Sequence, residues 1–285
     1  MSARFALATI VSVLSLATIG HADLKENFKK ANLRIVAEGH EFTEGPTLDE
    51  GGDILFTSPK QSSIVSHSID EESNSEFYQG EHPVSALFYR DAKLYATQGT
   101  LNRVIEIKSP NEFVTLADSF EGAPFNKPND LWVSPQGHIY FTDPNYGSPA
   151  APDGEFAYII SKEGEVRKIN SKFVRPNGIV GSEDGRMLFI TDAGDSKTYR
   201  FSLGEDGIPG EAHLFTDIGG DGMTLDSFGN LYIGVPRQKA LVAIDPKGKE
   251  IARISDFGCT NVCFGPEGKI LYITRSPGLW ALKIY

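Results

Sequence analysis

One phrase recurs six times along the chain: an oxygen-bearing side chain, a small or polar residue, an apolar strand, a turn and a second apolar strand. The six phrases begin at Glu44, Ser85, Asn129, Asn177, Asp221 and Thr260, in steps of 41, 44, 48, 44 and 39 residues. In five of the six units a glycine stands eight residues after the first residue. A period of about 40 to 50 residues with several short strands per unit is typical of β-propeller blades. The repeat therefore predicts an all-β protein, a six-bladed β-propeller.

The strands that follow each phrase predict how the ring closes. Every unit continues with a third apolar strand and often a weaker fourth, which gives four antiparallel strands per blade. The sixth unit stops at Tyr285, after its third strand. Residues 33–37 form an apolar strand before the first unit and have no partner of their own, so we expect this N-terminal strand to complete the last blade and remove its open edge. No linker divides residues 23–285, which we expect to form one propeller domain.

The N-terminus has the order of a secretory signal peptide. Residues 1–4 carry one positive charge, residues 5–16 are almost entirely apolar, and Gly20 and Ala22 place small residues before a cleavage point. The apolar run is shorter than the about 20 residues that a membrane-spanning helix needs. We expect residues 1–22 to be cleaved and the protein to be exported, either periplasmic or secreted, without a membrane partner. An uncleaved N-terminal anchor is the alternative.

The charge and the cysteines restrict the possible partners. The net charge is −11, whereas nucleic-acid-binding domains usually carry a basic patch, so we expect no nucleic-acid partner. Cys259 and Cys263 lie four residues apart in a segment that enters a predicted strand. An extended chain would hold them about 13 Å apart, whereas a disulfide needs Cα atoms closer than about 7 Å. We therefore expect two buried free thiols, unless this segment is tightly turned.

The first residues of the six units predict a metal site. Equivalent positions of the blades lie on a circle around the channel axis, so these side chains should meet at one end of the channel. Together they offer two carboxylates, two carboxamides and two hydroxyls. Oxygen donors of this kind suit a hard cation, and calcium, which accepts six to eight oxygens in tolerant geometry, fits better than magnesium. Asn or Asp before Gly is also a common turn pair, so a structural role is the alternative.

The ends of the second strands predict further polar groups at the same rim. Asp143 and Asp192 could orient the metal-binding Asn side chains, or each could cap its own turn. Arg237 and Arg275 could anchor an anionic or hydroxyl-rich substrate. We count all four, with Ser85, Tyr146 and Thr260, as candidates that support the metal or line the substrate site.

Six segments of the chain resemble the signature phrases of the senescence-marker-protein and gluconolactonase family, a regucalcin-like group of calcium-dependent six-bladed propellers. They are residues 43–46 (TEGP), 126–130 (NKPND), 141–147 (FTDPNYG), 175–178 (RPNG), 221–226 (DGMTLD) and 260–262 (TNV). The resemblance extends from about residue 33 to residue 285. It implies a carboxylic-ester hydrolase that opens small lactones such as sugar lactones.

The resemblance also implies the site residues. A divalent cation, Ca²⁺ or another of its kind, would be held by Glu44, Asn129, Asn177 and Asp221, and Asp221 would be the acid–base residue. Such a metal polarises the lactone carbonyl while Asp221 takes a proton from water; direct attack by Asp221 is the alternative. Ser85 stands where relatives place a residue that touches the sugar, which leaves the identity of the lactone open. A phosphotriesterase on the same metal site and a non-catalytic propeller that binds a ligand or a protein are the rival functions.

Overall fold

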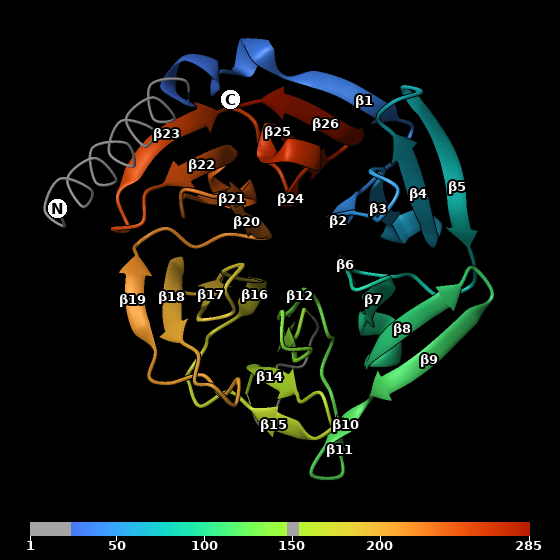
Figure 1. Cartoon of the computed structure of the whole chain (residues 1–285), viewed down its shortest axis with the longest axis vertical. Coiled ribbons are helices and arrows are strands. Elements are labelled where there is room, and N and C mark those ends of the chain that lie inside the picture. Colours follow the sequence, from blue (N-terminus) through green and yellow to red (C-terminus); the bar gives the residue numbers. More distant parts are fainter. Residues whose placement is uncertain (1–23, 147–153) are drawn as a thin grey trace, which may run out of the picture.

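The computed structural model describes residues 24–146 and 154–285, in which six four-stranded antiparallel sheets surround a central channel (Figure 1). The first three sheets consist, from the channel outward, of β2 (Glu44–Leu48), β3 (Ile54–Ser58), β4 (Ser63–Ser68) and β5 (Ser73–Gln79); β6 (Leu87–Arg90), β7 (Lys93–Gln98), β8 (Arg103–Ser109) and β9 (Glu112–Ala117); and β12 (Leu131–Val133), β13 (Ile139–Asp143), β14 (Phe156–Ile160) and β15 (Val166–Lys168).

The last three sheets follow the same order. They consist of β16 (Pro176–Gly181), β17 (Met187–Asp192), β18 (Lys197–Ser202) and β19 (His213–Thr216); β20 (Met223–Leu225), β21 (Leu231–Val235), β22 (Ala240–Ile244) and β23 (Glu250–Ser255); and β24 (Asn261–Phe264), β25 (Ile270–Arg275), β26 (Gly278–Lys283) and β1 (Arg34–Glu38). The shorter elements are the hairpin β10 (Ser119–Phe120) and β11 (Ala123–Pro124) and the 3₁₀ turns η1 (Lys30–Asn32), η2 (Pro59–Gln61), η3 (Gly99–Leu101), η4 (Pro236–Gln238) and η5 (Pro266–Gly268). The prediction of a six-bladed all-β propeller is confirmed.

The strand β1 closes the ring as the sequence predicts. It pairs antiparallel with β26, with Arg34 opposite Ala281 and Glu38 opposite Gly278. The last blade thus joins an N-terminal strand to three C-terminal strands, and Figure 1 shows β1 beside β26 at the rim. The predicted signal peptide, residues 1–22, lies outside the described residues.

Burial explains why the second strand of each blade reads as a continuous apolar run. Every residue of β3, β13 and β21 is buried, because neighbouring blades cover both faces of these sheets. The outermost strand β5 is mostly exposed and polar. The turn between the first two strands needs a left-handed residue, and glycine supplies it, as with Gly137 at φ +86° and Gly229 at φ +79°.

Both cysteines are free thiols, as predicted. Cys259 is buried, and Cys263 is only partly buried by its neighbours. Burial raises the pKa of both thiols above the usual range.

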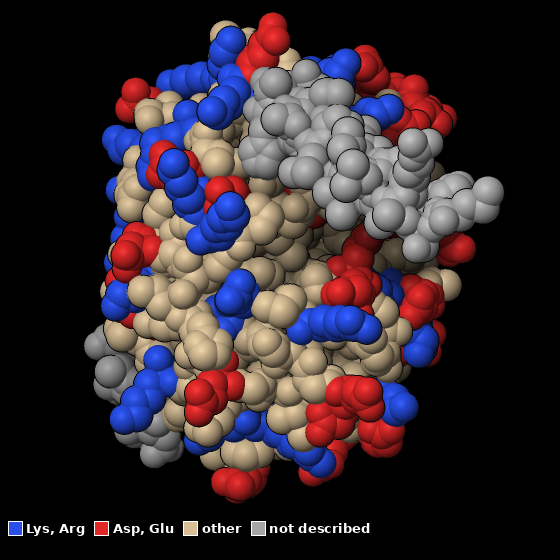
Figure 2. All heavy atoms as spheres, turned by 60° about the vertical axis from the view of Figure 1, so that its left-hand side comes forward, with Lys and Arg blue, Asp and Glu red and all other residues tan. Residues whose placement is uncertain are grey.

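Two observations concern the outside of the molecule. On the side that carries β19 and β23, Figure 2 shows Lys and Arg interspersed with Asp and Glu among uncharged residues. Within residues 24–146 and 154–285, no helix has the length and apolar character needed to cross a membrane.

Candidate metal centre and active site

A pocket of about 420 Å³ opens at the end of the channel where the first strands of the blades begin. Its size lies within the range of about 300 to 1,000 Å³ that is usual for small-molecule sites. Its walls are formed by Phe42, Glu44, Pro59, Ser85, Asn129, Tyr146, Asn177, Ala193, Ser196, Gly219, Gly220, Asp221, Val235, Pro236, Arg237 and Gln238. All four residues that the resemblance implies as metal ligands are among them.

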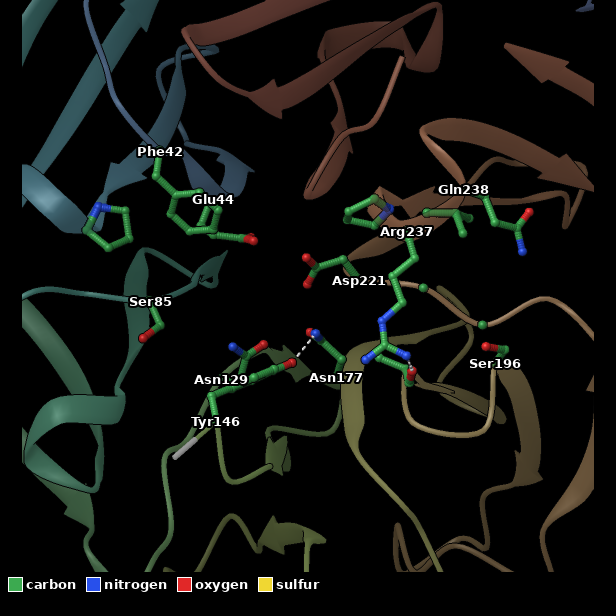
Figure 3. A pocket seen from close by; sticks show the side chains of 16 residues that line it. Phe42, Glu44, Ser85, Asn129, Tyr146, Asn177, Ser196, Asp221, Arg237 and Gln238 are labelled. Atoms are coloured by element: carbon green, nitrogen blue, oxygen red, sulfur yellow. Dashed lines mark hydrogen bonds between the residues drawn. The ribbon is translucent and has the colours of Figure 1, made fainter. Parts of the chain in front are cut away.

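The four implied ligands converge although they come from four different blades. Figure 3 shows the carboxylates of Glu44 and Asp221 directed toward one another across the pocket, with the carboxamides of Asn129 and Asn177 close by. Glu44 is the first residue of β2 and Asn177 lies in β16, while Asn129 and Asp221 each precede an innermost strand by two residues. The repeat therefore places the donors, since each occupies the same position in its blade.

Threonines at the ends of the second strands fix the main chain under these side chains. In each of four blades, a threonine hydroxyl donates to the main-chain carbonyl of the pocket residue in the next blade; the pairs are Thr57–Ser85, Thr97–Asn129, Thr142–Asn177 and Thr191–Asp221. The same Thr191 oxygen accepts the N–H of Gly178 at 2.9 Å. Because each threonine bonds two blades at once, it sets the separation between neighbouring pocket residues.

The glycines that follow Asn177 and Asp221 allow neighbouring blades to approach each other closely. A Cβ atom on Gly178 would lie 2.2 Å from the carbonyl oxygen of Asp221, and one on Gly222 would lie 1.8 Å from the Asn261 side chain. Neither glycine has a positive φ angle. At these two positions the glycine is therefore required by packing around the channel, and not by a left-handed turn.

The electrostatics of the pocket disfavour two ionised carboxylates without a counter-charge. Burial, together with the negative charges of Asp221 and Asp130, raises the pKa of Glu44 well above its usual range. Burial, followed by the charge of Asp130, raises the pKa of Asp221 to about 7. Holding both groups ionised costs free energy, and a bound cation would offset that cost.

The chemistry of the donors fits a hard cation. The Oδ1 atom of Asn177 is buried and accepts no hydrogen bond from the described residues, while its Nδ2 atom donates to the Tyr146 hydroxyl. A buried acceptor without a partner beside two carboxylates is the arrangement that an oxygen-preferring cation satisfies. The donors would be two carboxylates and two carboxamides; the described part of the chain holds no metal-binding group of three or more His, Cys, Asp or Glu side chains.

Two polar residues below the pocket, Asp130 and Asn261, were not among the sequence candidates. Asp130 is 6% exposed, and its carboxylate accepts hydrogen bonds from the N–H groups of Leu131 at 3.0 Å and Ile179 at 3.3 Å and from the Asn261 amide at 3.4 Å. Burial raises the pKa of Asp130 to about 7. A signal for both was present in the repeat: they occupy the second position of their phrases, where the other four phrases carry glycine or alanine.

Asp143 and Asp192 hold loops in place by bonding to the main chain. The Asp143 carboxylate accepts the N–H groups of Asn126 and Lys127, both at 2.8 Å. Asp192 accepts those of Val174 at 2.6 Å and Arg175 at 2.7 Å. Each thus fastens the segment just before a pocket asparagine, and of the two roles that the sequence left open these main-chain bonds favour the structural one.

The remaining candidates divide into two groups. Ser85, Tyr146 and Arg237 line the pocket, and Arg237 also donates to the Ala193 carbonyl at 3.0 Å. Thr260 and Arg275 are not among the lining residues. The Thr260 hydroxyl donates to the Thr43 carbonyl at 2.7 Å, which links the last blade to the first, and the Arg275 guanidinium lies 4.4 Å from the centre of the Phe257 ring.

The fold and the pocket define a six-bladed propeller with carboxylate and carboxamide oxygens gathered at the mouth of its channel. Comparison with known proteins gives the family: the model of the SMP-30/gluconolactonase/LRE-like region matches residues 42–276, so the chain belongs to that family. The resemblance found in the six phrases is thereby confirmed.

Individual relatives are distant and mostly lactonases. A gluconolactonase from Zymomonas mobilis is 25% identical over 282 residues, which cover 86% of this chain and 79% of the relative. A pentonolactonase, XacC, from Haloferax volcanii is 24% identical over 258 residues, covering 86% of this chain and 85% of the relative. A solved gluconolactonase from Xanthomonas campestris has the same fold, with a TM-score of 0.81, 20% identity and 89% coverage of each chain.

Proposed function

We propose that this protein is a divalent-cation-dependent lactonase, with calcium as the cation, and that Asp221 is its general base. The observation that carries the proposal is the convergence of two carboxylates and two carboxamides in a pocket of small-molecule size; the Asn177 carboxamide has a buried oxygen with no hydrogen-bond partner in residues 24–146 and 154–285. The names of the distant relatives support lactones as the substrates.

Each pocket residue has a distinct part in the proposed reaction. Glu44, Asn129, Asn177 and Asp221 would hold the cation, and the two neutral carboxamides leave it more electron-poor than four carboxylates would. When bound, the cation supplies the Lewis acidity that polarises the lactone carbonyl and stabilises the developing oxyanion. Asp221 accepts a proton from the attacking water on a carboxylate oxygen, and that proton can pass to the alkoxide that leaves as the ring opens.

The pKa of Asp221 bears on this role. Burial and Asp130 raise it toward 7, where a carboxylate is a useful base near neutral pH. A cation bound to the same carboxylate lowers that pKa, and also lowers the pKa of water in contact with it. The lower pKa of the water favours proton transfer to Asp221, and the lower pKa of the cation-bound carboxylate opposes it.

The test is hydrolysis of a panel of sugar, aliphatic and aromatic lactones, with calcium and with chelator, together with a phosphotriester. We expect turnover of at least one lactone class, loss of that turnover on chelation, and recovery when calcium is restored. Turnover of the phosphotriester alone would favour the phosphotriesterase. Absence of any turnover, with calcium still raising the melting temperature, would favour a binding propeller.

We also propose that the protein is exported after removal of residues 1–22. The support is the charged, apolar and small-residue order of the N-terminus.

A further inference from the structure

The walls of the pocket beside Glu44, Asn129, Asn177 and Asp221 are largely apolar. Phe42 and Pro59 come from the blade of Glu44, and Val235 and Pro236 directly precede Arg237 in the blade of Asp221. Figure 3 shows the Phe42 ring and the Arg237 side chain on opposite sides of the pocket, with the Tyr146 ring below them. A substrate whose ester group reaches Asp221 therefore has apolar surface beside the rest of its body.

The polar side chains of the described walls lie mostly at the exposed mouth of the pocket, and part of their hydrogen-bonding capacity is used within the protein. The Tyr146 hydroxyl already accepts a hydrogen bond from Asn177, Arg237 donates to Ala193, and the Gln238 Oε1 atom accepts from Arg253 at 3.0 Å. Both Arg237 and Gln238 are exposed at the mouth of the pocket.

Among the described wall residues, the serine hydroxyls are those of Ser85 and Ser196. Of these, only Ser85 is partly buried in the described pocket; Ser196 is exposed. A lactone hydroxyl that is held against Phe42, Pro59 or Val235 would lose water without regaining a hydrogen bond.

We propose that the substrate is a lactone with an apolar alkyl or aryl arm and few hydroxyl groups, and that Phe42 contacts this arm. The inference rests on the proposed lactonase function and departs from the sugar lactones in the names of the relatives. Each methylene removed from water by the wall contributes about fourfold to binding. Each hydroxyl buried without a partner costs about tenfold or more.

The first experiment compares lactones that differ only in the arm. At saturating calcium, kcat/KM is measured for an unsubstituted δ-lactone, for δ-lactones with alkyl arms of increasing length, and for D-glucono-δ-lactone. We expect kcat/KM to rise about threefold to fourfold per methylene until the arm fills the pocket. The sugar lactone should fall about 10²-fold below the best alkyl lactone.

The outcomes separate this inference from the function on which it rests. If the sugar lactone is the best substrate, or if kcat/KM does not depend on arm length, the apolar-arm inference is overturned and the lactonase remains. If no lactone is turned over, both are overturned.

The second experiment tests Phe42. Phe42→Ala should lower kcat/KM about tenfold for the longest arm and less than twofold for the unsubstituted lactone, while Phe42→Leu should retain most of the preference. The matched control is Phe228→Ala: Phe228 is 37% exposed and lies between β20 and β21, at the end of the blade away from the pocket. The control should change neither value. Equal losses for all lactones in Phe42→Ala, with an unchanged melting temperature, would contradict the proposed contact.

Discussion

Replacing Asp221 with asparagine should stabilise the protein when divalent cations are absent and weaken its response to calcium when they are present. The pKa of Asp221 is raised from 3.8 to about 7, mainly by burial and then by Asp130. At about 1.4 kcal/mol per pKa unit, this shift limits the cost of the ionised group to about 4 kcal/mol. The Asp221 side chain is partly exposed to the pocket, so solvent screening reduces this cost. We take the cost of ionising Asp221 in the folded state as about 2 kcal/mol.

The sign of the pH dependence follows from the same shift. Because the folded pKa lies above the unfolded one, the folded state holds the proton more tightly, and wild-type stability falls as the pH rises from about 4 to about 7. The Asp221→Asn variant has no carboxyl group at this position, so it does not lose stability in this way as the pH rises. In chelator, Asp221→Asn should therefore melt about 5 °C above the wild type at about pH 8 and close to it at about pH 4.5.

Calcium should narrow the difference in stability between the variant and the wild type. A ligand at a hundred times its Kd stabilises the folded state by about 2.7 kcal/mol. The variant keeps an oxygen donor at residue 221 but loses one of the two ligand charges, so its calcium-induced increase in melting temperature should be smaller than that of the wild type.

The assay is thermal unfolding at both pH values, in chelator and in calcium. The control is Asp70→Asn, since Asp70 is exposed between β4 and β5 and should show no effect. The reasoning is refuted if Asp221→Asn is the less stable protein in chelator at about pH 8. It is also refuted if calcium stabilises wild type and variant equally.

Three further predictions concern catalysis, packing and processing. At saturating calcium, Asp221→Asn should reduce lactonase turnover about 10²- to 10⁴-fold, whereas Glu44→Gln should raise the calcium concentration needed and recover part of its rate; a calcium titration of turnover checks both, and near-normal rates for Asp221→Asn would make Asp221 a ligand only. Gly178→Ala should displace the Asp221 main chain, because its Cβ would lie 2.2 Å from the Asp221 carbonyl oxygen; isothermal titration should show weaker calcium binding, and unchanged affinity would contradict the packing argument. Protein recovered from the secreted or periplasmic fraction of the expressing cell should begin immediately after Ala22, as mass spectrometry of the intact chain can verify; a retained N-terminus would indicate the anchor.

The repeat in the sequence was sufficient to predict the fold. The apolar strands recur at a near-constant spacing, and a propeller is built from such local units, so the number of blades can be read along the chain. The partner of residues 33–37 could also be predicted, because the sixth unit lacks one strand and an unpaired edge is unfavourable. The ring of six oxygen-bearing residues followed from the same symmetry, since equivalent positions of the blades face one axis, and five of the six line the pocket. The choice of Glu44, Asn129, Asn177 and Asp221 as metal ligands came from the family resemblance.

The tertiary structure alone decided which neighbours of those positions face the channel. The sequence pointed to Thr260, but it is Asn261 that bonds to Asp130 below the pocket, and the Thr260 hydroxyl turns to the first blade. No shift in register is involved: the N–H of Thr260 donates to the Thr274 carbonyl at 2.9 Å, as that of Asn129 does to the Thr142 carbonyl, so Thr260 holds the same position in its blade. What differs is the short hydroxyl side chain, whose partner, the Thr43 carbonyl, is present only where the last blade meets the first.

The surroundings of Phe42 were likewise set by the closed ring. Phe42 lines the same pocket as Val235, which comes from another blade, and the Thr260 hydroxyl of the last blade donates to the Thr43 carbonyl of the first. Such contacts join segments far apart in the chain, and their distances depend on how closely the blades pack, which glycines such as Gly178 permit. A local repeat determines which residues approach the axis; only the assembled ring determines what each of them meets there.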